Sequence, residues 1–398
     1  GGIFEGTGFR VGSATLIDAQ TGHYSAELPI APEMLTRPKI LTGSENALYG
    51  FNSTVGTISY GWSQIADGGS LTLGGGDHDL NFQRIHHGLT GQLGESVEWS
   101  WGVEAEMSRS ESDGTIQFGD HDFDRSSGRI QLVGPNSQTD FFAGYQAKFF
   151  GWPGMYTANP ASLETENLKT RLFAINHQQQ YGEGSEIELT AYHRKHKDHF
   201  VLTRTNPTLY EAFHVTKILS LGIAGRHAFS KSFALKYSAQ FTGDEIDSED
   251  FYNGTPLGGL ERGKFQSRSY QKVGIIPEYN FQFNDAEKIT LRAGASFDDT
   301  NRDESELSAL FDLTWERYRT NGGVDSIYLS YAESSQVAGY TAIGGGTPDE
   351  TDPTGNQPRF ASNPFLEREI SKNLELGLSI KRSDWSFETA IFHRWDDN

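Results

Sequence analysis

The sequence feature that most constrains the fold is a strict alternation of apolar and polar residues, which recurs along the chain. In Glu287–Phe297 the apolar residues, from Ile289 to Phe297, occupy every second position, and Lys288, Arg292 and other polar residues lie between them. Successive side chains of a strand point to opposite faces, so this stretch has one apolar and one charged face. The same pattern recurs at Val97–Met107, Phe141–Phe149, Leu235–Phe241 and Leu374–Ile380. The spacing of these segments predicts an all-β protein with about 15 strands.

Composition limits where such strands can lie. The chain has 398 residues, of which 36% are hydrophobic, and it contains no cysteine. Mean hydropathy is -0.54, and no apolar run approaches the roughly 20 residues that a membrane helix needs. A β-barrel can cross a bilayer at this hydropathy, because only alternate residues meet lipid. Without cysteine there are no disulfides or thiolate metal sites, and a net charge of -20 argues against nucleic acid as a partner.

Residues 1–61 are expected to form a small mixed α+β unit. Arg10–Asp18 is expected to form a short strand, and Ile30–Leu35 a single helical turn with its proline near the start, where the missing N–H costs nothing. Lys39–Leu41 and Val55–Tyr60 are expected to be short strands around a loop punctuated by glycine. Two acidic segments, 120–124 and 244–250, are expected to lie in loops of the long β region that follows.

From about Gly68 onward, the connections between predicted strands alternate between short and long. Outer-membrane barrels have short turns at one end and long loops at the other. A soluble β-sandwich also alternates apolar and polar residues, but its strands are usually shorter and its loop lengths need not differ between ends. We therefore favour a transmembrane barrel. The expected short connections are 134–136, 182–185, 230–232, 284–286, 321–323 and 382–384, and the long ones 108–128, 151–167, 200–214, 242–270, 298–306 and 334–372.

Several segments resemble a known family. Leu41–Tyr60, with its Ala-Leu-Tyr-Gly and Gly-Thr-Ile-Ser-Tyr, is similar to the end of the plug domain of TonB-dependent outer-membrane receptors. Asp18–Ile30, which reads Asp-Ala-Gln-Thr-Gly-His-Tyr-Ser-Ala-Glu-Leu-Pro-Ile, resembles an upstream plug segment. Phe142–Gly151 and Tyr192–His214 look like barrel strands and a loop of the family, and Asn363–Gly377 is similar to its Asn-Pro-x-Leu signature.

The resemblance implies an incomplete transmembrane antiparallel barrel, with about 15 of about 22 strands, and a partial α+β plug inside it. Residues 1–66 would form the rear part of the plug, and residues 67–398 a barrel that lacks its last strands. The resemblance further implies a location in the bacterial outer membrane, contact with membrane lipid, and coupling to the TonB complex. The segment that contacts TonB, a signal peptide and the front of the plug are expected to be missing from this chain.

The segment Thr36–Gly43 departs from the family pattern. Relatives often carry Glu-Arg-Val-Glu-Val-x-Arg-Gly here, and the resemblance implies that these charges latch the plug to the barrel wall. This chain keeps Arg37, but Thr36, Lys39 and Thr42 stand at the positions of the two glutamates and the second arginine. Arg37 is thus the candidate latch residue, and a latch built from it alone would be weaker or would have a different partner.

The candidate ligand-binding residues lie in the first plug loop. In the family the matching loop points toward the extracellular ligand, and Gln20, Thr21, His23 and Tyr24 offer hydrogen-bonding and stacking groups there. The alternative is a structural turn buried against the barrel wall. Both readings stay open.

Candidate metal ligands are few. Asp120, Asp122 and Asp124 have the alternating spacing of a calcium loop, although the glycine and distal glutamate of an EF-hand are absent. Calcium bridging in an external loop is one reading, and a solvated acidic loop is the other. His193, His196 and His199 would alternate between the faces of a strand, so they cannot converge on one ion. No cofactor is expected, and no catalytic group or enzymatic activity is predicted.

The resulting hypothesis is an outer-membrane receptor for TonB-dependent uptake of a scarce nutrient, such as a ferric siderophore, a cobalamin-like chelate or a glycan. Two alternatives remain at this point: a passive porin or adhesin barrel, and a soluble sugar-binding β-sandwich. A small mixed unit at the start of the chain favours the receptor, since a passive barrel does not need one.

Overall fold

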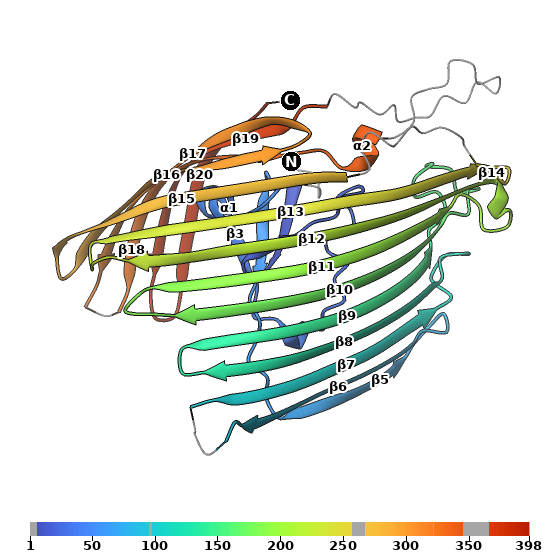
Figure 1. Cartoon of the computed structure of the whole chain (residues 1–398), viewed down its shortest axis with the longest axis horizontal. Coiled ribbons are helices and arrows are strands. Elements are labelled where there is room, and N and C mark those ends of the chain that lie inside the picture. The colour runs from blue at the N-terminus through green and yellow to red at the C-terminus, as the bar shows by residue number, and fades with distance from the viewer. Residues whose placement is uncertain (1–5, 95–97, 257–266, 321, 345–365, 398) are drawn as a thin grey trace.

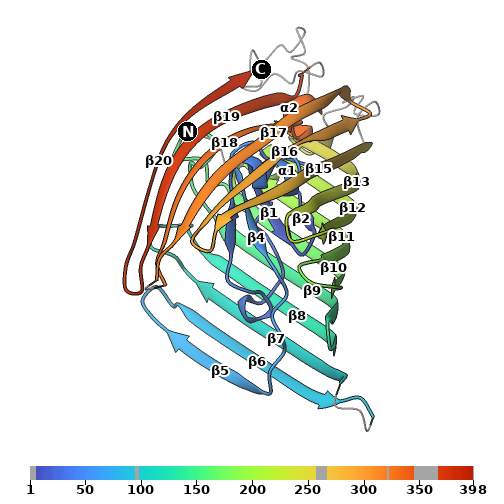
Figure 2. The same ribbon diagram turned by 90° about the vertical axis from the view of Figure 1, so that its left-hand side faces the viewer.

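The computed structural model describes residues 6–94, 98–256, 267–320, 322–344 and 366–397. Within these ranges a long, curved antiparallel sheet wraps around a small unit made by the start of the chain (Figures 1 and 2). No helix in the described ranges is long and apolar enough to cross a membrane.

The small inner unit is a four-stranded sheet in the order β2-β1-β4-β3 with two short helical segments. β1 pairs in parallel with β4 and antiparallel with β2. We call the unit the plug. Its elements are β1 (Thr7–Val11), β2 (Ala14–Leu16), η2 (Pro32–Met34), β3 (Lys39–Leu41), α1 (Gly43–Tyr49) and β4 (Gly56–Tyr60).

The large sheet forms a wall of sixteen described strands. Fifteen of them pair in chain order, with β13 next to β15, and the short β14 pairs only with β13. β5 and β20 form its two edges. The elements are β5 (Gly68–Gly75), β6 (Asn81–Gln92), β7 (Ser100–Ser112), β8 (His121–Gly134), β9 (Ser137–Gly151), β10 (Thr165–Gln180), β11 (Glu186–Val201), η3 (Pro207–Leu209), β12 (Tyr210–Ala228), β13 (Phe233–Tyr252), β14 (Thr255–Pro256), β15 (Ser267–Asn284), β16 (Glu287–Thr300), β17 (Asp303–Tyr318), β18 (Val324–Gln336), α2 (Tyr340–Gly344), β19 (Glu369–Lys381) and β20 (Ser386–Asp397).

The wall has an apolar outer face and a polar inner face. On β10, Phe173 is 54% exposed and Ile175 is 50% exposed, whereas Thr170 and Asn176, at alternate positions on the opposite face of the same strand, are 1% exposed. On β7, Glu104 and Glu106 are buried while Met107 is 61% exposed. A water-soluble sheet would bury the apolar residues, so this polarity fits a sheet that faces lipid outside and a polar interior. The predicted fold class is confirmed, and a β-sandwich is excluded because a single curved sheet surrounds the plug.

The hydrophobic core of the plug is completed by residues of the inner face of the wall. Met34 and Ala31 of the η2 region are fully buried, and Phe51 and Trp62 pack into the same cluster with Tyr192 and Ile218 of the wall. α1 makes a second cluster, in which Ala47 and Leu48 contact Ile276, Leu310 and Ala332. The plug therefore depends on the wall for part of its apolar burial.

Four local expectations were wrong. Arg10–Asp18 is not one strand, because the chain turns at Gly12, whose φ is +65°, and continues as β2. The glycine-punctuated loop contains α1, which tertiary packing stabilises. The acidic segments 120–124 and 244–250 lie largely in β8 and β13, because these strands continue past the apolar band. The connection at 298–306 is a tight turn, since Thr300 pairs with Asp303.

Candidate functional site

The first plug loop lies against the inner wall. We call Asp18–Ser25 the apex loop. The guanidinium of Arg194 on β11, which is 1% exposed, donates to the carbonyls of Ile17 (3.0 Å) and Tyr24 (2.7 Å) and lies 3.8 Å from the carboxylate of Asp18. Burial alone would raise the pKa of Asp18, but the Arg194 cation and nearby hydrogen-bond donors hold that pKa below its usual value. The apex loop is thus fixed to the wall by a charged anchor.

Two predicted ligand residues also bond the wall. The Gln20 amide donates to Asp198 Oδ2 at 2.6 Å, and the Tyr24 hydroxyl donates to Glu166 Oε1 at 3.3 Å. Burial, followed by the nearby carboxylates of Asp198 and Glu166, raises the pKa of Tyr24, so its hydroxyl stays a donor. The Tyr24 ring also packs on His196, with 4.9 Å between ring centroids. Gln20 and Tyr24 therefore connect the apex loop to β10 and β11.

The other two predicted ligand residues lie nearer the surface. The side chain of Thr21 is half-buried and donates to Asp18 Oδ2 at 3.2 Å. His23 is exposed, and its ring lies edge-on to Tyr24 at 6.3 Å between centroids. The four residues thus fall into an inner pair that contacts the wall and an outer pair that lies closer to solvent.

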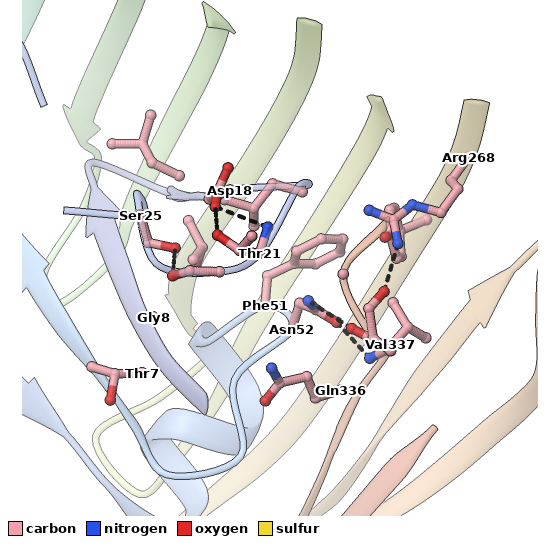
Figure 3. Close-up of a pocket in the computed structure, with 17 residues that line it drawn as sticks. Thr7, Gly8, Asp18, Thr21, Ser25, Phe51, Asn52, Arg268, Gln336 and Val337 are labelled. Carbon is pink, nitrogen blue, oxygen red and sulfur yellow. Dashed lines mark hydrogen bonds between the residues drawn. The ribbon is translucent and has the colours of Figure 1, made fainter. Parts of the chain in front are cut away.

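A small cavity separates the apex loop from the far wall (Figure 3). Its volume is about 20 Å³, which is room for roughly one water molecule. Arg268 of β15 closes one side by donating to the carbonyls of Ala338 (2.6 Å) and Ala19 (3.2 Å). Asn52 closes another by accepting from the backbone N–H of Val337 at 2.8 Å. A nutrient-sized molecule cannot pass here unless these contacts open.

Ion pairs join the plug to the wall elsewhere, and sequence reasoning missed all of them. Their plug carboxylates are visible in the sequence, but their cationic partners lie 51 to 191 positions away along the chain, so no local pattern could identify them. The pairs, besides Asp18 with Arg194, are Glu27 with Lys148 (2.8 Å), Glu33 with Arg84 (Oε1 to Nη1 2.7 Å) and Glu45 with Lys236 (3.6 Å).

Arg37 lies at the other end of the plug. Its side chain is exposed, and it lines a hollow of about 560 Å³ between the plug and the strands β10 to β13, together with Arg10, Glu186 and Glu188. Within the described ranges Arg37 has no ion pair. The latch assigned to Arg37 by resemblance stays a prediction, while the plug ion pairs above supply charged contacts to the wall.

The three aspartates lie at the start of β8: Asp120 immediately precedes the strand, and Asp122 and Asp124 are among its first residues. Asp120 pairs with Arg204, whose guanidinium hydrogen bond lowers the pKa of the Asp120 carboxyl. Asp122 and Asp124 are exposed, and Asp122 lies 3.8 Å from Arg109. Among the described residues no group of three or more His, Cys, Asp or Glu side chains is arranged to hold a metal ion. The calcium site therefore stays a prediction, with Asp120 already bonded to an arginine.

Comparison with known proteins identifies the family. The family model described as "TonB dependent receptor-like, beta-barrel" matches residues 40–398. The chain belongs to this family of receptor barrels. No curated protein sequence matches it. Membership of this receptor family places the chain in the bacterial outer membrane.

Solved structures share the fold. The ferripyoverdine receptor FpvA of Pseudomonas aeruginosa superimposes with a TM-score of 0.68 at 15% identity, over 98% of this chain and 57% of that one. The siderophore receptor PirA of the same species gives 0.66 at 15% identity, over 98% and 66%. The alcaligin receptor FauA of Bordetella pertussis gives 0.66 at 12% identity, over 98% and 62%. The chain thus spans less than two thirds of the length of these structures.

Proposed function

We propose that the protein of which this chain is part takes up a scarce nutrient across the outer membrane with energy from the TonB complex. A ferric siderophore is the favoured substrate, and a cobalamin-like chelate or a glycan are the other candidates. The observation that carries the proposal is a plug that fills the concave side of the wall and is held there by hydrogen bonds and ion pairs as well as by apolar contacts.

The nature of those contacts supports coupled transport. A plug held only by a large apolar interface would open at a high cost, because exposed apolar surface is unfavourable in water. Polar contacts such as Arg194 with the apex-loop carbonyls can be exchanged for contacts with water, so their net contribution to stability is modest. A plug of this kind can be moved by an external force without loss of the barrel.

Within this proposal the apex loop senses the ligand. Thr21 and His23 would contact the ligand first, and Gln20 and Tyr24 would contact it or pass its binding to the wall through Asp198 and Glu166. Similarity to receptors named for pyoverdine, alcaligin and siderophores favours a ferric chelate over a sugar. The substrate itself belongs to the proposal.

Uptake in living cells tests the proposal. The complete protein is expressed in cells that lack their own siderophore receptors. Radiolabelled iron is supplied to these cells as complexes with hydroxamate, catecholate and mixed chelators. Uptake of cobalamin and of oligosaccharides is measured in parallel. We expect saturable uptake of one class, which stops when the TonB complex is deleted. Equal uptake with and without the TonB complex would instead indicate a passive porin, and no uptake of any class with retained cell adhesion would favour an adhesin.

A further inference from the structure

Four cations form a patch on the outer face of the wall. We call Lys169, Arg171, Lys195 and Lys197 the cation patch. Lys169, Arg171 and Lys197 are exposed and Lys195 is half-buried, while the residues between them on β10 and β11 are buried against the interior. The patch therefore lies on the same face of β10 as the lipid-facing Phe173, in a chain whose net charge is -20.

The register of the strands places like charges opposite each other. Lys169 is the direct partner of Lys197, and Arg171 is the direct partner of Lys195. Like charges at directly opposed positions of neighbouring strands are destabilising. In the described part of the chain none of the four forms an ion pair with a carboxylate, whereas Lys217, opposite Lys195 on β12, is paired with Glu245. An anion from outside the chain would relieve this repulsion.

The position of the patch indicates where that anion comes from. Further along β10, toward its short-turn end, Phe173 and Ile175 line a shallow apolar hollow of about 700 Å³ on the outer face, together with Leu219 of β12. In the opposite direction, β10 begins at Thr165, after the long connection 152–164. Arg171 lies over the ring of Tyr145, 5.8 Å from its centroid. Aromatic residues mark the boundary between the apolar band and the headgroups in such barrels, so the cations lie at headgroup level on the long-loop side.

We propose that the cation patch binds the phosphate groups of a phosphorylated lipid in the outer leaflet of the membrane, with the acyl chains of that lipid on the apolar hollow. Arginine and lysine bind phosphate through charge-assisted hydrogen bonds. The cations are open to the headgroup layer, and the hollow beneath them is open to the chains. This proposal depends on the outer-membrane location and not on the transported substrate, so the uptake experiment and the lipid experiment can fail independently.

Lipid binding by the complete protein tests the proposal. The protein is purified in a neutral detergent and titrated with bisphosphorylated lipid A, with the same lipid after removal of its phosphates, and with inorganic phosphate, and bound lipid is measured by native mass spectrometry. The variant is Lys169→Gln with Lys197→Gln. The charge-conserving variant Lys169→Arg with Lys197→Arg tests for rescue. Lys231→Gln with Lys381→Gln removes the same charge at the short-turn end.

The expected result is about fivefold weaker binding for each patch cation removed, because a basic residue near an anionic lipid surface contributes about that factor. The paired variant should thus bind about 25-fold more weakly, while the arginine variant and the Lys231 control bind like the unchanged protein. Raised salt should weaken binding in the same direction. Equal binding of phosphorylated and dephosphorylated lipid, unchanged binding by the glutamine variant, or displacement of the lipid by millimolar inorganic phosphate would overturn the proposal.

Discussion

Replacing Arg194 by methionine should release the apex loop from the wall. Methionine keeps much of the side-chain volume but removes the cation, so the carbonyls of Ile17 and Tyr24 lose their donors and the buried Asp18 carboxylate loses its counter-charge. Removing one partner of a buried ion pair typically costs about 3–5 kcal/mol. The loss falls on contacts between plug and wall, so it should appear as local opening of the plug and not as unfolding of the barrel.

Hydrogen exchange of the complete protein in detergent measures this opening. Amides of the apex loop should exchange about 100-fold faster or more in Arg194→Met, while amides in the centre of β10 should keep their protection. The matched control is Arg171→Met, which removes an exposed arginine from the outer face of the neighbouring strand and should leave the apex loop unchanged.

The pH dependence gives a second readout. The pKa of Asp18 lies below its usual value in the folded protein, so its stabilising contribution is present at neutral pH and is lost as pH falls through the folded pKa. In Arg194→Met the carboxylate is buried without a cation, so its pKa should rise and the defect should be largest at neutral pH and smaller in acid. Adding Asp18→Asn should recover part of the loss. Unchanged apex-loop exchange in Arg194→Met, or a double variant that is looser than the single one, would refute this reasoning.

Three further predictions concern single residues. Glu33→Gln should destabilise η2 by about 0.5–1 kcal/mol at low salt and by less at high salt, because the ion pair of Glu33 with Arg84 is partly exposed. The hydrogen bond from Arg84 lowers the pKa of Glu33, so the stabilising contribution of the pair should be lost in acid. Hydrogen exchange of the η2 amides, measured as a function of pH, tests this. Leu221→Arg should destabilise the membrane-embedded barrel by about 2–4 kcal/mol in denaturant titrations in vesicles, since Leu221 is 55% exposed on the lipid face. Gly12→Ala should destabilise the plug by about 1–3 kcal/mol, as measured by hydrogen exchange of the plug amides. The reason is that φ of Gly12 is +65° and that a Cβ at this position would lie 2.1 Å from Asn176 Oδ1.

The regular part of this fold could be predicted from the sequence because its signal is local. The alternation in Glu287–Phe297 becomes β16, with Thr290 and Ser296 buried inside and Phe297 exposed outside. The helical turn at Pro32 and the strand at Lys39–Leu41 are also confirmed. Each of these segments carries its own pattern, and neighbours in the chain are neighbours in the wall.

What could not be predicted depends on contacts between distant residues. α1 has only seven residues and no side-chain cap at its N-terminus, and it is stabilised where Leu48 packs on Ile276 and Leu310. The placement of Gln20 and Tyr24 depends on Asp198 and Glu166, which lie more than 140 positions away. The sequence could name the apex loop as important, but it could not tell which of its side chains contact the wall.

The central claim is that apolar side chains face lipid while polar ones face the plug, and spin labelling along one strand tests it most directly. The chain contains no cysteine, so single cysteines can be placed at each position from 168 to 175 of β10, labelled with a nitroxide and studied in lipid vesicles. We predict that accessibility to oxygen alternates with a period of two, high at Phe173 and Ile175 and low at Leu172 and Ala174. Equal accessibility at all positions, or the opposite phase, would contradict the account.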